Sequence, residues 1–551
     1  MFSNEKIIET KTCKHCQSSF SITDKDLEFY EKVSPNFLGK KYLIPPPTLC
    51  PDCRQQRRLS FNNIRNLYKR LCNATGKPII SIFSPDKLYK VYNQDFWWSD
   101  NWNPLNYGQN FDFNKCFFEQ FNELKHKVPF MNLYVDSNEN SDYVNQSGWS
   151  KNCYLSFCSD YCEECHYCSD VYNSKKSIDC TYGFDIENCY FCIDCKNCSN
   201  LKYCKNCIDC SNSLSLDNCI GCKNCINCSD LVNNQYFINN KQYSKEEYEK
   251  EEKNILLKNE FYNDIMKPKR FYIGKNNENV NGNYLINCKN LDHCFDDNNQ
   301  EDSKYCHNLK GGKDCYDMNR WGRYSELCYE SSAIGENTKN VIFSEACWGN
   351  INNLLYCSFC CNNSSNLFGC IGLRNKSYCI LNKQYTKEEY EILVPKIIEH
   401  MQKTGEWGEF FPSSISPFGY NETVAMEYFQ VIFPNHENSP HPNPLPMGEG
   451  IQGGGQGIFN WSNYQTPFPK VEKTIQAIKL PNNIKDIPDD ILNWAIECEI
   501  SKKPFKIISQ ELEFYRKHNL PIPRRHPDRR HLDRMNLRNS IGLFDRKCDK
   551  C

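Results

Sequence analysis

The sequence predicts a mostly β protein with helical elements, in which two cysteine-rich, solenoid-like modules lie between two related end modules. Three observations predict this class. Cysteines recur at a regular spacing in the middle of the chain, two CxxC pairs stand near the amino terminus, and the two ends of the chain match each other at constant offsets. The chain has 551 residues, enough for several domains.

Composition narrows the classes of function. The 66 basic and 68 acidic side chains leave a net charge of −2, which argues against attraction of the whole molecule to nucleic acid or an anionic membrane. The amino terminus lacks an apolar signal segment, and no run of about 18 apolar residues predicts a membrane span. We therefore expect a cytoplasmic protein. In that reducing compartment most of the 37 cysteines would be metal ligands or buried thiols rather than disulfides.

The amino-terminal CxxC pairs predict a zinc site. Cys13 and Cys16 are separated from Cys50 and Cys53 by 33 residues. Two such pairs supply the four thiolates of a tetrahedral zinc site, and a closed four-thiolate site leaves no open position for catalysis. Pro51 suits the first position of a helix, which we expect over residues 54–67. A CxxC that opens a helix predicts a treble-clef or zinc-ribbon finger. A redox dithiol would need a βαβ pattern, which this region lacks.

The carboxyl end is a degenerate copy of this module. Residues 20–32 match residues 505–517 at an offset of 485, and residues 51–72 match residues 527–548 at an offset of 476. The ligand positions become Cys498, Ser501, His526 and Arg529. Serine and arginine are poor zinc ligands, so we expect this copy to bind no metal and Cys498 to be a core thiol.

Cys548 and Cys551 form a last CxxC pair. These two thiolates would make half of a second zinc site, and its remaining ligands would come from a continuation of the chain or from a partner chain. At the matching position of the first copy, Cys72 is followed three residues later by Thr75.

A cysteine repeat occupies the middle of the chain. Of the 17 cysteines between Cys153 and Cys228, 16 fall into four columns with a constant period of 15. This register predicts a narrow solenoid with one 15-residue coil per repeat and cysteine ladders inside. Asn or Asp precedes many of the cysteines and suits left-handed coil corners. Two alternatives stay open: metal or cluster binding by runs such as 189–198, and disulfides.

A second module repeats the end of the first. Residues 236–249 match residues 378–391 at an offset of 142, and 11 cysteines lie between Cys288 and Cys379. Each copy opens a charged helix, with Ser244 or Thr386 as its cap. We expect these helices to cap or brace the solenoids.

These observations predict six segments. They are a finger (1–75), a degenerate knuckle and aromatic connector (76–133), solenoid module 1 plus helix (134–265), solenoid module 2 plus helix (266–405), a connector with a Pro/Gly-rich insertion at 434–457 (406–497), and the degenerate finger copy (498–551).

Two further features bear on function. Basic side chains follow the CxxC of the finger and recur in its copy. They would either contact phosphates or form a solvated or ion-paired helical face; they are Arg54, Arg57, Arg58, Arg524, Arg525, Arg529 and Arg530. The sequence contains no P-loop, HExxH or GxSxG motif.

The chain resembles one protein family over nearly its whole length. The resemblance rests on residues 50–58 (CPDCRQQRR), 84–92 (SPDKLYKVY), 96–100 (FWWSD) and 511–528 (ELEFYRKHNLPIPRRHPD). The family is an uncharacterised zinc-ribbon, cysteine-repeat family of uncultured small-genome bacteria. Some members carry a CaiB/BaiF label, which implies CoA transfer, whereas this chain shows no α/β nucleotide-binding pattern.

The leading hypothesis is a non-enzymatic, zinc-containing binding or scaffold protein with an unknown protein partner, in which the two end modules clamp the solenoids. One alternative is a nucleic-acid or ribosome-associated factor. The other is a metal-storage or redox protein.

Overall fold

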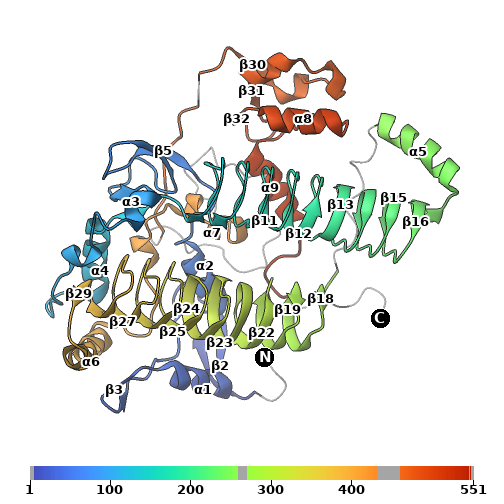
Figure 1. Cartoon of the computed structure of the whole chain (residues 1–551). Helices are drawn as coiled ribbons and strands as arrows, with labels where there is room; N and C mark the ends of the chain where they lie inside the picture. Colours follow the sequence, from blue (N-terminus) through green and yellow to red (C-terminus); the bar gives the residue numbers. More distant parts are fainter. Residues whose placement is uncertain (1–4, 259–269, 431–458, 469, 545–546, 548–551) are drawn as a thin grey trace.

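The chain forms two β-solenoids that lie side by side, with the remaining elements packed around them (Figure 1). The structure is a computed structural model that describes residues 5–258, 270–430, 459–468, 470–544 and 547. The fold is mostly β with few helices, and the two solenoids together have about 19 turns. The predicted fold class is confirmed.

Nearly all neighbouring strands within each solenoid are parallel. Solenoid 1 begins with the short parallel pair β9 (Val135–Asp136) and β10 (Ser147–Gly148), and its main sheet contains β11 (Ser169–Tyr172), β12 (Thr181–Glu187), β13 (Lys196–Lys202), β14 (Ser211–Asp217), β15 (Lys223–Ser229), β16 (Gln235–Ile238) and the antiparallel β17 (Lys241–Gln242). Solenoid 2 contains β18 (Gly274–Lys275), β19 (Glu278–Asn283), β20 (Leu285–Ile286), β21 (Lys289–Phe295), β22 (Asn298–Lys304), β23 (His307–Trp321), β24 (Ser325–Ile334), β25 (Thr338–Ile342), β26 (Ile351–Leu355), β27 (Ser365–Phe368), β28 (Ser377–Ile380) and the antiparallel β29 (Lys383–Gln384).

The predicted 15-residue coil is wrong. In solenoid 1 each coil advances the residue number by 12, since Ser169 pairs with Thr181 and Phe184 pairs with Lys196. Coils of solenoid 2 vary, and Gly312 pairs with Ser325 at an offset of 13. The structural unit is a triplet of residues. Both 12 and 15 are multiples of three, so cysteines placed at every third residue fall into columns at either spacing.

Each triplet has one residue in the left-handed backbone region. Positive φ angles recur at every third position through solenoid 1, as at Asp194 (φ 53°), Asn197 (φ 51°) and Asn200 (φ 52°). Asn and Asp tolerate this conformation better than other L-residues. The prediction that these residues form the coil corners is confirmed.

The two solenoids run in opposite directions. Asp170 of solenoid 1 contacts Asn308 of solenoid 2 through a 3.0 Å hydrogen bond, and Lys310 lies 3.4 Å from the ring centre of Tyr172. Farther along, a single arginine, Arg538, contacts both Asp194 and Asp296. Residue numbers therefore rise in one solenoid where they fall in the other.

The amino-terminal module contains a hairpin, two helices and a small second hairpin. They are β1 (Ile7–Thr12), β2 (Ser19–Thr23), α1 (Asp24–Val33), β3 (Asn36–Phe37), β4 (Lys40–Lys41) and α2 (Pro51–Leu59). Helix α2 begins at Pro51 as predicted, but it ends at Leu59 rather than at residue 67. The chain turns away after Leu59, and Asn145 of solenoid 1 donates a 3.1 Å hydrogen bond to the carbonyl of Ile64.

The carboxyl-terminal copy repeats the hairpin and the two helices. It contains β30 (Lys473–Gln476), β31 (Trp494–Glu497), β32 (Pro504–Phe505), α8 (Ser509–Lys517) and α9 (Pro527–Asn536). The additional strand β30 pairs in parallel with β31 of its hairpin. Helix α8 matches α1, and α9 matches α2.

The remaining elements connect the modules. They are β5 (Tyr68–Leu71), β6 (Pro78–Ser81), β7 (Val91–Tyr92), α3 (Gln94–Trp98), α4 (Phe117–Lys127), β8 (Phe130–Met131), α5 (Lys245–Lys258), α6 (Lys387–Thr404) and α7 (Ala425–Tyr428). The predicted caps of the two charged helices are present. Ser244 accepts from the Glu247 backbone at 3.2 Å, and Thr386 accepts from that of Glu389 at 3.2 Å.

Candidate metal centre

Four cysteine sulfurs converge in the amino-terminal module. The Sγ atoms of Cys13, Cys16, Cys50 and Cys53 all lie within 4.8 Å of one another, and those of Cys16 and Cys50 are 3.6 Å apart. A tetrahedral ion with Zn–S bonds of roughly 2.3 Å requires sulfurs about 3.8 Å apart. The donor set and its spacing therefore fit a metal ion.

Local backbone structure positions each thiol. Cys13 and Cys16 lie in a tight turn between β1 and β2, where Gln17 has a φ of 64° and its N–H donates to the Cys13 carbonyl at 3.0 Å. Cys50 is the residue before α2, and Cys53 lies in the first turn of that helix. Three of the sulfurs are buried, and Cys16 is partly exposed.

The electrostatics of the cluster suit a cation. The hydrogen bond from the Cys53 thiol lowers the pKa of Cys50 to about 5, and the same contact raises the pKa of Cys53. Burial raises the pKa of Cys16. The amino terminus of α2 also favours negative charge at Cys50. Four thiolates repel one another without a cation, whereas a bound metal ion offsets that repulsion.

Helix α2 connects the cysteine cluster to solenoid 2. Arg54 and Arg58 both pair with Asp317 of β23, at 2.8 Å and 3.1 Å. The guanidinium of Arg54 also lies over the ring of Tyr305, 5.3 Å from its centre. Arg57 pairs with Glu409 at 2.9 Å and also contacts Glu330 of β24. These arginine side chains are buried, so the ion pairs lie inside the molecule.

The carboxyl-terminal copy makes the same contacts on solenoid 1. Arg534 pairs with Asp179 at 2.7 Å, and Arg530 contacts the same carboxylate. The guanidinium of Arg530 lies 4.4 Å from the ring centre of Tyr167. Tyr167 and Asp179 correspond to Tyr305 and Asp317 at an offset of 138. The molecule thus has an internal pseudo-twofold relation, in which each end module docks on the solenoid that is farther from it along the chain.

Each end module also reaches the other solenoid. Gln146 of solenoid 1 donates to Asn62, just after α2, at 2.9 Å. Arg538, at the matching position after α9, pairs with Asp296 of solenoid 2. Both end modules therefore contact both solenoids.

The degenerate copy keeps the turn without the ligands. The Lys502 N–H donates to the Cys498 carbonyl at 3.2 Å with φ 57° at Lys502, which repeats the geometry at Gln17. Cys498 is fully buried in an apolar cluster, as predicted for a core thiol. Arg529, at the last ligand position, pairs with Asp533 at 3.0 Å.

The solenoid cysteines line the interior and donate to backbone carbonyls. The thiol of Cys165 donates to Ser174 O at 3.5 Å, and that of Cys192 donates to Leu201 O at 3.5 Å, both nine residues on. In the described part of the chain, Cys13, Cys16, Cys50 and Cys53 are the one group of three or more potential ligands within 4.8 Å. The solenoid cysteines thus pack inside the coils, as the ladder interpretation predicts.

The basic residues considered for nucleic acid contact other groups of the molecule. Besides the α2 arginines and Arg530, Arg524 donates to Leu480 O at 3.0 Å and Arg525 pairs with Glu499 at 2.8 Å. Arg525 and Arg529 are ion-paired, and Arg524 is held by hydrogen bonds. Cys548, Cys551 and the 434–457 insertion lie outside the described residues.

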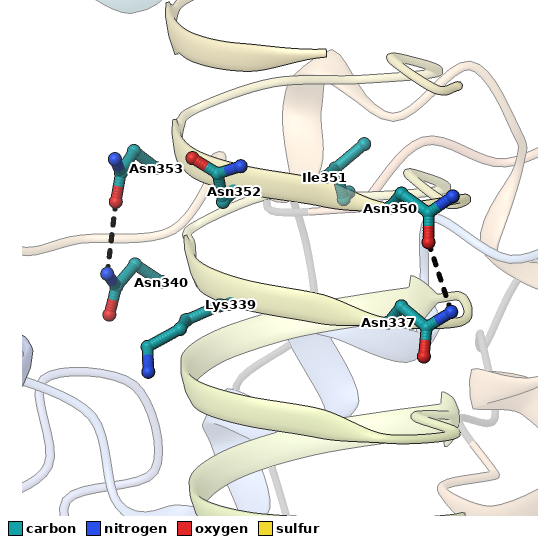
Figure 2. Close-up of a pocket in the computed structure, with 7 residues that line it drawn as sticks. All are labelled: Asn337, Lys339, Asn340, Asn350, Ile351, Asn352 and Asn353. Carbon is teal, nitrogen blue, oxygen red and sulfur yellow. Dashed lines mark hydrogen bonds between the residues drawn. The ribbon is translucent and has the colours of Figure 1, made fainter. Parts of the chain in front are cut away.

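A shallow hollow of about 420 Å³ lies on the outer face of solenoid 2 (Figure 2). Asparagine ladders border it on both sides: Asn337 donates to Asn350 at 3.0 Å, and Asn340 donates to Asn353 at 3.0 Å. These four residues have positive φ and so form coil corners. Lys339 in the hollow pairs with Glu326 at 2.9 Å.

Comparisons with known proteins assign no family. No protein-family model and no curated protein sequence matches the chain. A solved structure, a putative acetyltransferase from Desulfovibrio desulfuricans G20, matches 53% of this chain and 91% of its own at 8% identity, with a TM-score of 0.10. That score carries no argument about fold or activity. Among the described helices, none is long and apolar enough to cross a membrane.

The carboxylates that pair with these arginines were not predicted from the sequence. Asp179 and Asp317 lie inside the repeats, where an Asp at a coil corner needs no further explanation. Two repeats in the sequence could have identified them. Arg54 and Arg58 recur as Arg530 and Arg534 in the end modules, and Tyr167 and Asp179 recur as Tyr305 and Asp317 in the solenoids.

Proposed function

We propose that the protein is a scaffold whose four-cysteine centre binds one structural zinc ion and fixes the amino-terminal clamp on the solenoids. The observation that carries the proposal is the continuity from metal centre to clamp. Cys50 and Cys53 open α2, and the next turns of the same helix place Arg54 and Arg58 on Asp317. An ion held by those cysteines would fix the end of the helix that docks.

Zinc is the metal that this donor set favours. Four thiolates in a closed tetrahedral site are typical of structural zinc, and the ion there is held rather than used in catalysis. We also propose that the chain belongs to the zinc-ribbon, cysteine-repeat family that its sequence resembles.

Hydrogen exchange before and after chelation tests the role of the centre. Removal of the metal from the full chain should speed amide hydrogen exchange in residues 5–67 and in the facing strands β23 and β24. The reason is that the amino-terminal module would no longer be fixed to solenoid 2. Exchange in β13–β15 of solenoid 1, near the contact with the carboxyl-terminal copy, should stay unchanged. These strands serve as the internal control. Unchanged exchange in α2, or faster exchange throughout both solenoids, would contradict the proposal.

A further inference from the structure

The pseudo-twofold relation identifies two corresponding ladders, one on each solenoid. In solenoid 1, Ile208, Ile220 and Val232 occupy one position on three successive coils. In solenoid 2, Trp348, Cys361 and Arg374 do the same. Val232 and Arg374 are related by an offset of 142, the same offset that relates the ends of the two modules.

The solenoid 2 ladder is covered by tryptophans of the connector. Trp97 and Trp98 belong to α3, and Trp97 is completely buried in a cluster with Cys361. The ring of Trp98 lies 6.4 Å from that of Trp348. Arg374 lies over the rings of Trp97, Trp98 and Trp102, at 5.1, 5.7 and 5.6 Å from their centres.

No described element covers the solenoid 1 ladder to the same degree. Val232 is 57% exposed, Ile220 is 40% exposed and Ile208 is partly buried. The corresponding Cys361 is fully buried. Exposed aliphatic side chains that adjoin one another on successive coils form a candidate docking surface.

The ladder also continues a contact that the molecule already makes. Tyr172, Phe184, Lys196 and Ile208 occupy the same position on successive coils. Tyr172 meets Lys310 of solenoid 2 where the two solenoids touch. The exposed ladder is therefore the outward extension of the face that joins the solenoids.

We propose that Ile208, Ile220 and Val232 form a docking face for a tryptophan-rich segment of a partner. The segment would resemble residues 93–103 of this chain, which place Trp97, Trp98 and Trp102 on the corresponding ladder. Aliphatic side chains replace Trp348, Cys361 and Arg374, so the face is apolar throughout, and indole rings bury large apolar areas on such a surface.

This inference deepens the proposed scaffold function by giving the chemistry of one partner. Its test does not involve the metal centre. A failed binding test would remove the docking face and leave the metal result intact, and a failed metal test would do the reverse.

The probe is a fluorescein-labelled peptide with the sequence of residues 93–103, titrated against the full chain and followed by fluorescence anisotropy. We expect saturable binding that Ile220→Lys weakens at least ~10-fold, because the substitution places a charge in an apolar contact. The matched control is Ser211→Lys on a neighbouring strand of solenoid 1, which should leave the Kd unchanged. A peptide with Trp97, Trp98 and Trp102 replaced by serine should not bind.

Thermal unfolding of each variant checks that the fold is intact. Failure of the peptide to saturate up to ~1 mM, or equal binding by wild type and Ile220→Lys, would overturn the proposal. Light scattering supplies a second outcome: concentration-dependent dimers that Ile220→Lys abolishes would assign the ladder to self-association instead.

Discussion

At the residue scale, two buried aspartates each receive two arginines from an end module. Asp317 and Asp179 are fully buried, and the arginines that reach them are at most 4% exposed. A buried ion pair adds little over a well-packed apolar contact, but removal of one partner leaves an uncompensated buried charge. These carboxylates therefore make the docking of each end module specific.

Replacement of either aspartate by asparagine should destabilise the protein strongly. We expect Asp317→Asn and Asp179→Asn each to lower the free energy of unfolding by about 3–5 kcal/mol, measured by chemical denaturation. Glu326→Gln is the matched control, because the Lys339–Glu326 pair lies on the surface and its loss should cost less than about 1 kcal/mol. Equal effects of the buried and surface substitutions would contradict the clamp.

His166 gives a pH dependence with a definite sign. Burial lowers the pKa of this histidine to about 4, whereas an unfolded histidine titrates near 6.5. The folded state therefore binds fewer protons, and stability falls as the pH drops from about 6.5 toward 4.

Between pH 7 and pH 5, His166 should account for about 2 kcal/mol of lost stability. Denaturant titrations of wild type and His166→Gln at both pH values measure this difference. The variant should lose that much less than wild type, since glutamine does not titrate. An identical pH dependence in the two proteins would show that His166 is not held neutral.

At the element scale, the sequence predicted the solenoid and its corners but not the coil length. Cysteines at every third residue reveal that the repeating unit is a triplet of residues. They do not reveal how many triplets make one coil, because that number depends on how the sides of the coil close around the core. The cap residues Ser244 and Thr386 were predictable, because capping involves only neighbouring residues. The end of α2 was not, since it is set by contacts of the chain after Leu59 with solenoid 1.

The buried ladders predict a sharp pattern of thiol reactivity. In the reduced native protein, a short pulse of iodoacetamide should label Cys116, the exposed cysteine among the described residues, before any solenoid thiol. Peptide mass spectrometry locates the label. The Cys116→Ser variant provides the background, and the unfolded chain should react at every position. Fast native labelling of Cys192 or Cys207 would mean that the coils open readily.

At the scale of the whole molecule, the chain is two related halves joined by exchanged ends. The match between residues 20–72 and 505–548 predicted related end modules. Their placement did not follow from the match, because sequence similarity does not say which solenoid each module contacts. The structure shows that each end module bridges both solenoids. The amino-terminal module has four clustered thiols, and of the four matching positions in its copy Cys498 alone is a cysteine.

The central claim is that one end of the clamp is held by a single zinc ion and that the solenoid thiols hold none. Native mass spectrometry of the reduced, full chain tests this claim directly. We predict a mass increase of one zinc ion per chain, absent from Cys50→Ser and retained in Cys498→Ser. A chain without metal, or with several metal ions that persist in Cys50→Ser, would contradict it.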